Sequence, residues 1–243
     1  MSEQNSTVND YFGSGSNYTL KAGANKGVKV KSIAVEEKET DGVVSRWVNI
    51  VYVHPQPEVP EDDWSEMKET IFFPKPYQGE TTVNKDSLKY GFLNPMIGFF
   101  ENFSSKDAIK ERFAAVLSKL GVTDFTFDNV ETLHTQLKTL FNGWFDLVKG
   151  GIYNVEGTLI CGYKAPKEVD GETKQYLQVA SYGQSGCYKS AFRTNNSEEL
   201  PAEQTVFSNE KDRKYKYWSY SRTKSESQEE QSTETPTTTD TGW

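Results

Sequence analysis

Residues 27–53 constrain the fold more than any other part of the chain. They form two runs rich in β-branched residues, joined at Asp41-Gly42. Asp-Gly between apolar runs is typical of a tight β-hairpin, because glycine accepts the positive φ that the turn needs. A turn centred there predicts the register of the two strands, with Ile33 opposite Ile50, Val35 opposite Val48 and Glu37 opposite Arg46.

The second face of this hairpin carries Ala34, Glu36 and Lys38 opposite Asn49, Trp47 and Ser45, so a large aromatic, Trp47, stands on a polar face. The apolar alternation also changes phase at Lys31-Ser32, which indicates a β-bulge that bends and twists the strand. A long, bent first hairpin is what a small closed barrel requires. Trp47 is a candidate for stacking on a nucleic-acid base. Lys29 and Lys31, beside the bulge, are candidates for phosphate contacts.

The middle of the chain changes from strand to helix. Residues 69–73 are a third strand candidate, and residues 94–149 form a helical section. We expect Asn94-Pro95 to begin a first helix, Ser104-Ser105 to precede a second and Asp128 to cap a third. Apolar and aromatic residues recur at helical spacing in this section, as in ordinary core packing. His134 is expected to be a partly exposed helix residue.

A second hairpin is centred on Asp170-Gly171, between strands over residues 152–164 and 174–180. Pairing outward from this turn sets Lys167 opposite Lys174, Ala165 opposite Tyr176 and Tyr163 opposite Gln178. One face would then carry Tyr163, Tyr176, Lys167 and Lys174. Like charges that face each other cost stability, so this face suggests an anionic partner. A solvated hairpin tip with a shifted register is the alternative.

The end of the chain has two parts of opposite charge. Residues 211–224 hold six Lys/Arg against one acid, interleaved with aromatics. The candidates for binding there are Lys211, Arg213, Lys214, Tyr215 and Trp218, although a final strand with solvated lysines is also compatible with the pattern. Residues 225–243 hold five acids and no Lys or Arg, so this tail is expected to be disordered.

Composition favours binding over catalysis. The net charge is −8, of which the tail accounts for −5. Two cysteines and two histidines, far apart, give neither a disulfide framework nor a zinc site, and no cofactor is expected. No nucleophile with its base and no phosphate-binding glycine loop is present, so we do not expect an enzyme. The start of the chain lacks the features of a signal peptide, and no apolar run matches a bilayer, so we expect a cytoplasmic protein without membrane contact.

The order of elements is a bent hairpin, a third strand, a helical section and a second hairpin. This is the β-β-β-α-β-β order of an OB barrel. The predicted fold class is therefore mainly β with an α insertion (α+β): an OB-like five-stranded barrel with a helical section between its third and fourth strands. The predicted organisation is a flexible arm over residues 1–25, a binding domain over 26–224 and the acidic tail over 225–243.

The segment KAGANKGVKVKSIAVEEKE…VVSRWVNIVYV resembles the first barrel hairpin of phage single-stranded DNA-binding proteins. The acidic tail with a terminal aromatic is similar in kind to those of bacterial and phage single-stranded DNA-binding proteins. The tail departs from the usual bacterial ending in Pro-Phe, because it closes with Asp240-Thr241-Gly242-Trp243.

The resemblance implies a protein that coats single-stranded DNA in the host cytoplasm during phage replication, recombination or repair. It also implies that Asp240 and Trp243 recruit a polymerase, primase or helicase, and it leaves homo-oligomerisation open. A structural or adaptor protein of the virion, which uses the barrel for protein contacts, is the main alternative. An enzyme with an unfamiliar site is a second alternative.

Overall fold

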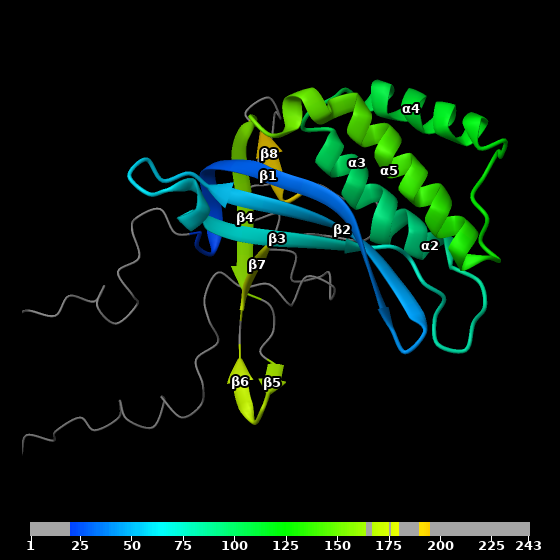
Figure 1. Ribbon diagram of the computed structural model, residues 1–243, viewed down its shortest axis with the longest axis horizontal. Helices are drawn as coiled ribbons and strands as arrows, with labels where there is room; N and C mark the ends of the chain where they lie inside the picture. The colour runs from blue at the N-terminus through cyan, green and yellow to red at the C-terminus, as the bar shows by residue number, and fades with distance from the viewer. Residues whose placement is uncertain (1–19, 164–166, 175, 180–189, 195–243) are drawn as a thin grey trace, which may run out of the picture.

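The computed structural model describes residues 20–163, 167–174, 176–179 and 190–194. Within these residues, a curled antiparallel sheet lies beside a group of helices (Figure 1). The strands follow one another across the sheet in the order β3-β2-β1-β4-β7, and β8 also pairs with β4. The bounds are β1 (Gly23–Thr40), β2 (Val43–His54), β3 (Ser65–Phe72), β4 (Glu156–Tyr163), β7 (Leu177–Val179) and β8 (Phe192–Thr194). This architecture confirms the α+β class with a curled sheet.

The first hairpin has the predicted register. Ile33 pairs with Ile50, Val35 with Val48 and Glu37 with Arg46. The turn residues Asp41 and Gly42 have φ values of 52° and 76°, as a tight hairpin turn with two left-handed residues requires. The register shifts between Val30 and Ser32, which confirms the bulge. The local sequence was sufficient here because the turn and the apolar alternation agree.

Strand β1 begins earlier than the sequence indicated, and it serves two partners. Its first half pairs with β4, from Gly23 opposite Cys161 to Lys29 opposite Glu156, and its second half pairs with β2. The side chain of Asn25 is buried and donates to the carbonyl oxygens of Lys21, Gly23 and Leu159. Leu20 is also buried. The flexible arm expected for residues 1–25 therefore does not include its last residues, because β4 holds them.

The helical section begins before residue 94. A continuous helix runs through α2 (Lys85–Leu88), a π-helical segment (Lys89–Leu93) and α3 (Asn94–Phe100). Asn84 caps it by accepting from the backbone N–H of Asp86, so the prediction that Asn94 caps a helix was wrong. Pro95 lacks an N–H and its ring would clash with a carbonyl of the preceding turn. The wider π turn before Pro95 accommodates both effects.

Two longer helices complete the section, α4 (Lys106–Lys119) and α5 (Val130–Ile152). Helix α4 follows Ser104-Ser105 as predicted, and Ser105 caps it by accepting from the N–H of Ala108. Asn129, and not Asp128, caps α5 by accepting from the N–H of Thr132. Helix α5 also continues through two glycines to Ile152, which is fully buried. The helix therefore ends where its apolar contacts end, and not at the glycines.

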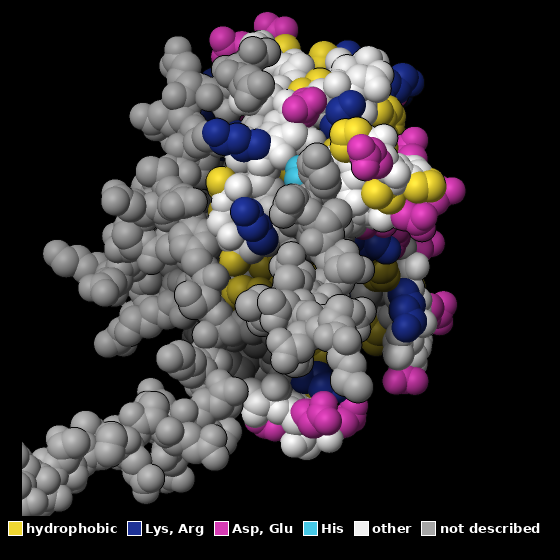
Figure 2. Space-filling model, turned by 90° about the vertical axis from the view of Figure 1, so that its left-hand side faces the viewer, with side chains coloured by type: hydrophobic (Ala, Val, Ile, Leu, Met, Phe, Trp, Pro, Cys, Tyr) yellow, Lys and Arg dark blue, Asp and Glu magenta, His cyan; other side chains and the backbone are white. Residues whose placement is uncertain are grey.

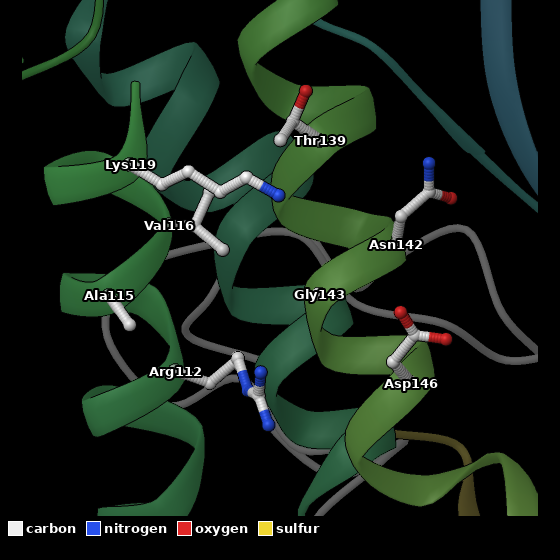
Figure 3. Close-up of a pocket in the computed structure, with 8 residues that line it drawn as sticks. All are labelled: Arg112, Ala115, Val116, Lys119, Thr139, Asn142, Gly143 and Asp146. Atoms are coloured by element: carbon white, nitrogen blue, oxygen red, sulfur yellow. The ribbon is translucent and has the colours of Figure 1, made fainter. Parts of the chain in front are cut away.

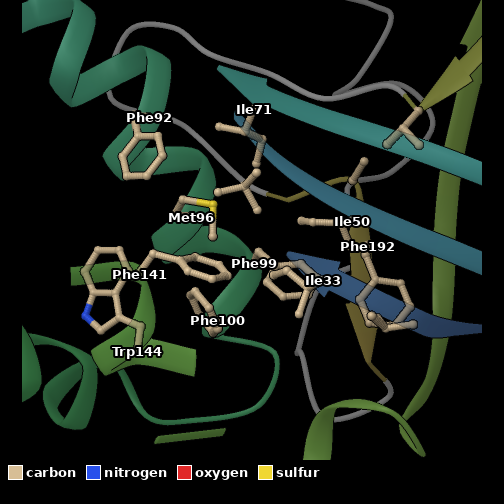
Figure 4. Close-up of a cluster of buried hydrophobic side chains, with 14 of the residues drawn as sticks. Ile33, Ile50, Ile71, Phe92, Met96, Phe99, Phe100, Phe141, Trp144 and Phe192 are labelled. Atoms are coloured by element: carbon tan, nitrogen blue, oxygen red, sulfur yellow. The ribbon is translucent and has the colours of Figure 1, made fainter. Parts of the chain in front are cut away.

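The core lies between the inner face of the sheet and helices α3 and α5 (Figure 4). Phe73, just after β3, meets Phe92 edge to face with ring centroids 4.8 Å apart. Phe100 contacts both Phe141 and Trp144. The indole N–H of Trp144 donates to the carbonyl of Ile109 and so connects α5 to α4. The aromatic residues at helical spacing are therefore core residues, as the periodicity predicted.

The second hairpin is only partly as predicted. Strands β5 (Lys167–Val169) and β6 (Glu172–Lys174) pair with Lys167 opposite Lys174. Closer to the sheet, however, Tyr163 lies opposite Leu177, and Gly162 lies opposite Gln178. This one-residue difference exchanges the two faces, so the prediction that Tyr163 and Tyr176 share a face was wrong. No helix among the described residues is long and apolar enough to cross a bilayer.

Candidate nucleic-acid interface

The β1–β2–β3 sheet has one face turned away from the helices. Side chains alternate along a strand, so the residues that neighbour the buried Val48, Ile50 and Ile71 lie on this opposite face. We call it the outer face, and its residues are Glu36, Lys38, Ser45, Trp47, Asn49, Val51, Lys68, Thr70 and Phe72. It combines aromatic, amide, hydroxyl and cationic groups on three adjacent strands.

An aromatic pair stands at the centre of the outer face. Trp47 of β2 lies opposite Phe72 of β3, with ring centroids 6.1 Å apart and ring planes inclined by 53°. Phe72 is 60% exposed, which is unusual for a phenylalanine on a strand. The structure thus confirms that Trp47 lies on the polar face, and it shows that Phe72 lies beside Trp47 on that face. The sequence signal for Phe72 was the strand alternation itself, since Phe73 next to it is buried.

Hydrogen bonds fix the position of the indole. Oε2 of Glu36 accepts from Nε1 of Trp47 at 3.2 Å and from Nδ2 of Asn49 at 2.6 Å. The other side-chain atom of Asn49, Oδ1, accepts from the hydroxyl of Thr70 at 2.9 Å. These bonds run across all three strands. The aromatic ring is therefore held in place before any ligand arrives, which lowers the entropy cost of stacking.

Lysines lie around the aromatic pair. Lys75, shortly after β3, donates to the hydroxyl of Ser45 at 2.6 Å, two residues from Trp47. Lys68 lies on the outer face of β3, opposite Val51. Lys38 lies near the hairpin turn, opposite Ser45. An extended anion on the aromatic pair would therefore find cations at several points along its path.

The two lysines predicted on β1 lie at the far end of the outer face. Lys29 is opposite Val53, six residues along β2 from Trp47 and so about 20 Å away. Lys31 forms a 2.6 Å ion pair with Glu66, and the hydrogen bond to this carboxylate raises the pKa of Lys31. Lys31 is therefore engaged by an acid in the free protein. These lysines do not share a site with Trp47 unless a ligand spans the sheet.

The β5–β6 hairpin is less cationic than its two lysines suggested. Lys174 pairs with Glu172 at 3.1 Å, and Glu168 and Asp170 are also exposed on this short hairpin. On the face seen in Figure 2, lysines and arginines lie scattered among acidic and apolar side chains, and the hairpin at the lower end carries both signs. Tyr176 is 56% exposed, whereas Tyr163 is partly buried. The structure does not gather the four predicted residues of this hairpin on one surface.

A polar network connects the first hairpin to α5. Arg46 bonds to Glu37 at 3.0 Å and to Glu131 at 2.8 Å, and its Nη1 lies 3.3 Å from Nδ1 of His134. Nε2 of His134 donates to the carbonyl of Pro74 at 2.9 Å. His134 is buried, and burial lowers its pKa, so the expectation of a partly exposed histidine was wrong. Both ring nitrogens of His134 therefore contact polar groups inside the protein, at Arg46 and Pro74, and are not part of a binding site.

Two other titratable groups are buried in the core. Burial raises the pKa of Glu69 to about 7, although the hydrogen bond that it accepts from the Tyr52 hydroxyl acts against this shift. Burial, with a contribution from Glu69, raises the pKa of the Cys161 thiol to about 12. The thiol is therefore protonated at neutral pH and is a poor nucleophile. Both groups lie on the side of the sheet away from the aromatic pair.

A groove of about 340 Å³ lies between α4 and α5 (Figure 3). Arg112 and Lys119 of α4 and Asp146 of α5 are its charged residues. A Cβ at Gly143 would lie 2.7 Å from a methyl carbon of Val116, so this glycine allows the helices to approach closely. The groove contains no nucleophile with a base beside it. In the described part of the chain, no group of three or more His, Cys, Asp or Glu is placed to hold a metal ion.

The remaining predicted residues lie outside the described residues. They are Lys211, Arg213, Lys214, Tyr215 and Trp218 of the cationic aromatic segment, and Asp240 and Trp243 of the tail. Their roles stay predictions from the sequence. Comparison of the chain with family models, curated proteins and solved structures finds no match to any of them.

Proposed function

We propose that the protein binds single-stranded DNA on the outer face of β1–β2–β3. The observation that carries this proposal is the pair of half-buried Trp47 and exposed Phe72 on a polar sheet face, with the indole fixed by hydrogen bonds and lysines nearby. Aromatic rings stack on bases of any sequence, and lysines neutralise the phosphates between them. A duplex keeps its bases inside the stack, so this surface suits a single strand.

The strand connections support an OB-like barrel. Strand β1 lies between β2 and β4, and β7 pairs with β4 and also contacts β3. We take β7 as the fifth strand, so that the sheet curls back towards its first edge with the helical section between the third and fourth strands. OB folds bind oligonucleotides on the face of strands 2 and 3, between the loops that follow strands 1 and 4. In this proposal the outer face is the binding face of strands 2 and 3. The β5–β6 hairpin is then part of the loop that follows the fourth strand.

Titration of a labelled single strand and a matching duplex at about 50 and 200 mM salt tests the proposal. We expect the single strand to bind more tightly than the duplex, with an affinity that falls steeply as salt rises. Binding without discrimination against the duplex would contradict the proposal. If the DNA does not bind at either salt concentration, the aromatic pair is better explained as a protein interface, as in the virion-adaptor alternative.

Two of the lysines around the aromatic pair should set part of the salt dependence. Changing Lys68 and Lys75 together to alanine should flatten the slope of log affinity against log salt by about 1–2, since each lost phosphate contact removes about one released counterion. Lys167 and Lys174, changed in the same way, are the comparison. We expect a smaller change there, because three acids share that hairpin. An unchanged slope in the Lys68/Lys75 variant would remove both residues from the phosphate path.

We further propose that the acidic tail, residues 225–243, competes with DNA and recruits replication proteins. A tethered polyanion reaches an effective concentration of order mM at nearby cationic surfaces, so it can occupy phosphate sites until DNA displaces it. The cationic aromatic segment at residues 211–224 directly precedes it. Once released, Asp240 and Trp243 are available to a basic, apolar pocket on a polymerase, primase or helicase.

Deletion of residues 225–243 should raise the affinity for single-stranded DNA at low salt by several-fold, and the gain should shrink as salt screens the tail. The melting temperature should stay nearly unchanged. Titration of the truncated and full chains at two salt concentrations measures both effects. The Trp243→Ala variant is the matched control, because it keeps all five acids and should bind DNA like the full chain while losing co-purifying replication proteins. A truncation that weakens DNA binding would show that the tail contributes to the site.

A further inference from the structure

A carboxylate stands at the edge of the aromatic pair. Glu36 lies directly opposite Trp47 in the β1–β2 register and is exposed. Within the described residues, both of its hydrogen bonds, from Trp47 and Asn49, go to Oε2. These bonds fix the direction of the carboxylate and leave Oε1 able to accept from a ligand. An acid is an unexpected neighbour for a surface that binds a polyanion, so its position calls for an explanation.

We propose that Glu36 selects the base that stacks on Trp47 and Phe72, favouring bases with an exocyclic amino group over thymine. This inference rests on the proposed binding of single-stranded DNA. Cytosine and adenine present an amino group that donates a hydrogen bond, and carboxylates accept from N4 of cytosine. Thymine presents carbonyl oxygens at the corresponding positions, and these repel a carboxylate. Glu36 is therefore a specificity residue, whereas the two rings supply most of the stacking energy.

The comparison of cytosine with thymine isolates this effect. Both bases have a single ring of nearly the same size, so they stack on Trp47 and Phe72 over similar areas. Their polar edges differ at position 4, where cytosine donates a hydrogen bond and thymine accepts one, and at N3, where the roles are reversed; thymine also carries a methyl group at C5. The proposed contact of Glu36 is with position 4. Preference between them therefore reports a polar contact and not a difference in stacking. The neighbouring amide of Asn49 does not supply this preference, because its Nδ2 and Oδ1 already bond to Glu36 and Thr70.

The test is a titration of oligo-dC and oligo-dT of about 20 nucleotides, longer than one OB-fold site, with the full chain and its Glu36→Gln variant. We expect the wild-type protein to bind oligo-dC about tenfold more tightly, the size of one good base contact. In Glu36→Gln the ratio should fall to about twofold or less. Glutamine keeps an oxygen for Trp47 and Asn49, but its amide group donates to thymine.

The matched control is Glu39→Gln, which removes the same charge from the same strand on the opposite face. It should raise the affinity for both oligonucleotides equally and leave their ratio unchanged, because it removes only a general repulsion of phosphates. If Glu36→Gln leaves the ratio unchanged while both oligonucleotides still bind, the selectivity inference is wrong and the proposed function stands. If neither oligonucleotide binds the wild-type protein, the proposed function fails together with the inference.

Discussion

The double variant Trp47→Ala, Phe72→Ala is expected to bind single-stranded DNA at least about thirtyfold more weakly than the wild-type protein. Removal of one stacked ring typically costs about 1–3 kcal/mol, and two neighbouring rings can serve successive bases. Each single variant should therefore lose about fivefold or more. Fluorescence-anisotropy titration at one fixed salt concentration measures these losses. A Trp47→Phe variant should retain much of the affinity, because it keeps a ring for the base.

We expect these variants to fold normally, so a loss of affinity would report the loss of the binding surface. Phe72 is 60% exposed, so its removal should have little effect on the melting temperature. The control is Tyr153→Ala, since Tyr153 is an exposed aromatic at the end of α5, away from the outer face. It should bind DNA like the wild type. If the double variant binds normally per folded molecule, the aromatic pair is not the binding surface.

Glu69→Gln is expected to stabilise the protein at about pH 8 by about 3 kcal/mol, the equivalent of the shift in the pKa of Glu69 from 4.5 to about 7. The folded-state pKa lies above the unfolded value, so the unfolded chain loses this proton first as the pH rises. The wild-type free energy of unfolding should therefore fall between about pH 4.5 and 7. The glutamine variant can still accept from the Tyr52 hydroxyl and does not ionise.

Urea unfolding at a series of pH values measures this difference. The two proteins should be similarly stable near pH 5 and should separate as the pH rises through 7. His134 acts in the opposite direction, because its lowered pKa reduces stability as the pH falls below its usual value, but this contribution is common to both proteins and cancels. Glu39→Gln, at an exposed acid of β1, controls for the loss of one negative charge. A constant difference between wild type and Glu69→Gln at all pH values would mean that Glu69 does not titrate in this range.

The sequence predicted those parts of the fold in which local signals agree. In the first hairpin, Asp41-Gly42 sets the turn and the alternation of apolar residues sets the faces, so register, bulge and the position of Trp47 were all predictable. The core helices followed from apolar periodicity over many residues. Within the helical section, the boundaries were less predictable. Caps compete over one or two positions, as Asp128 and Asn129 show, and a π turn that accommodates Pro95 has no simple local signature.

The candidate site was only half visible in the sequence. Trp47 was noticeable because it interrupts a polar face, whereas Phe72 stands in a strand whose alternation had to be combined with the pairing of β2 and β3. In the second hairpin, the sequence predicted the turn but not the faces of the strands. Its strands are short, so the turn at Asp170-Gly171 predicted the pairing of Lys167 with Lys174 but not the shift that separates Tyr163 from Tyr176. The hydrogen bonds that Glu36 accepts from Trp47 and Asn49 depend on side-chain conformations that no sequence pattern specifies.

The division of β1 between two partners has a consequence for the order in which the chain assembles. Strands β1, β2 and β3 are consecutive, so their meander can form from local contacts while later residues are still being synthesised. The pairing of β1 with β4 joins residues as far apart as Asn25 and Leu159, which are separated by 134 positions, and it must wait for the whole helical section. The aromatic pair on the outer face belongs entirely to the early piece. Substitutions in the helical section should therefore alter the late closing step and the lifetime of the folded state more than the shape of the surface that meets DNA.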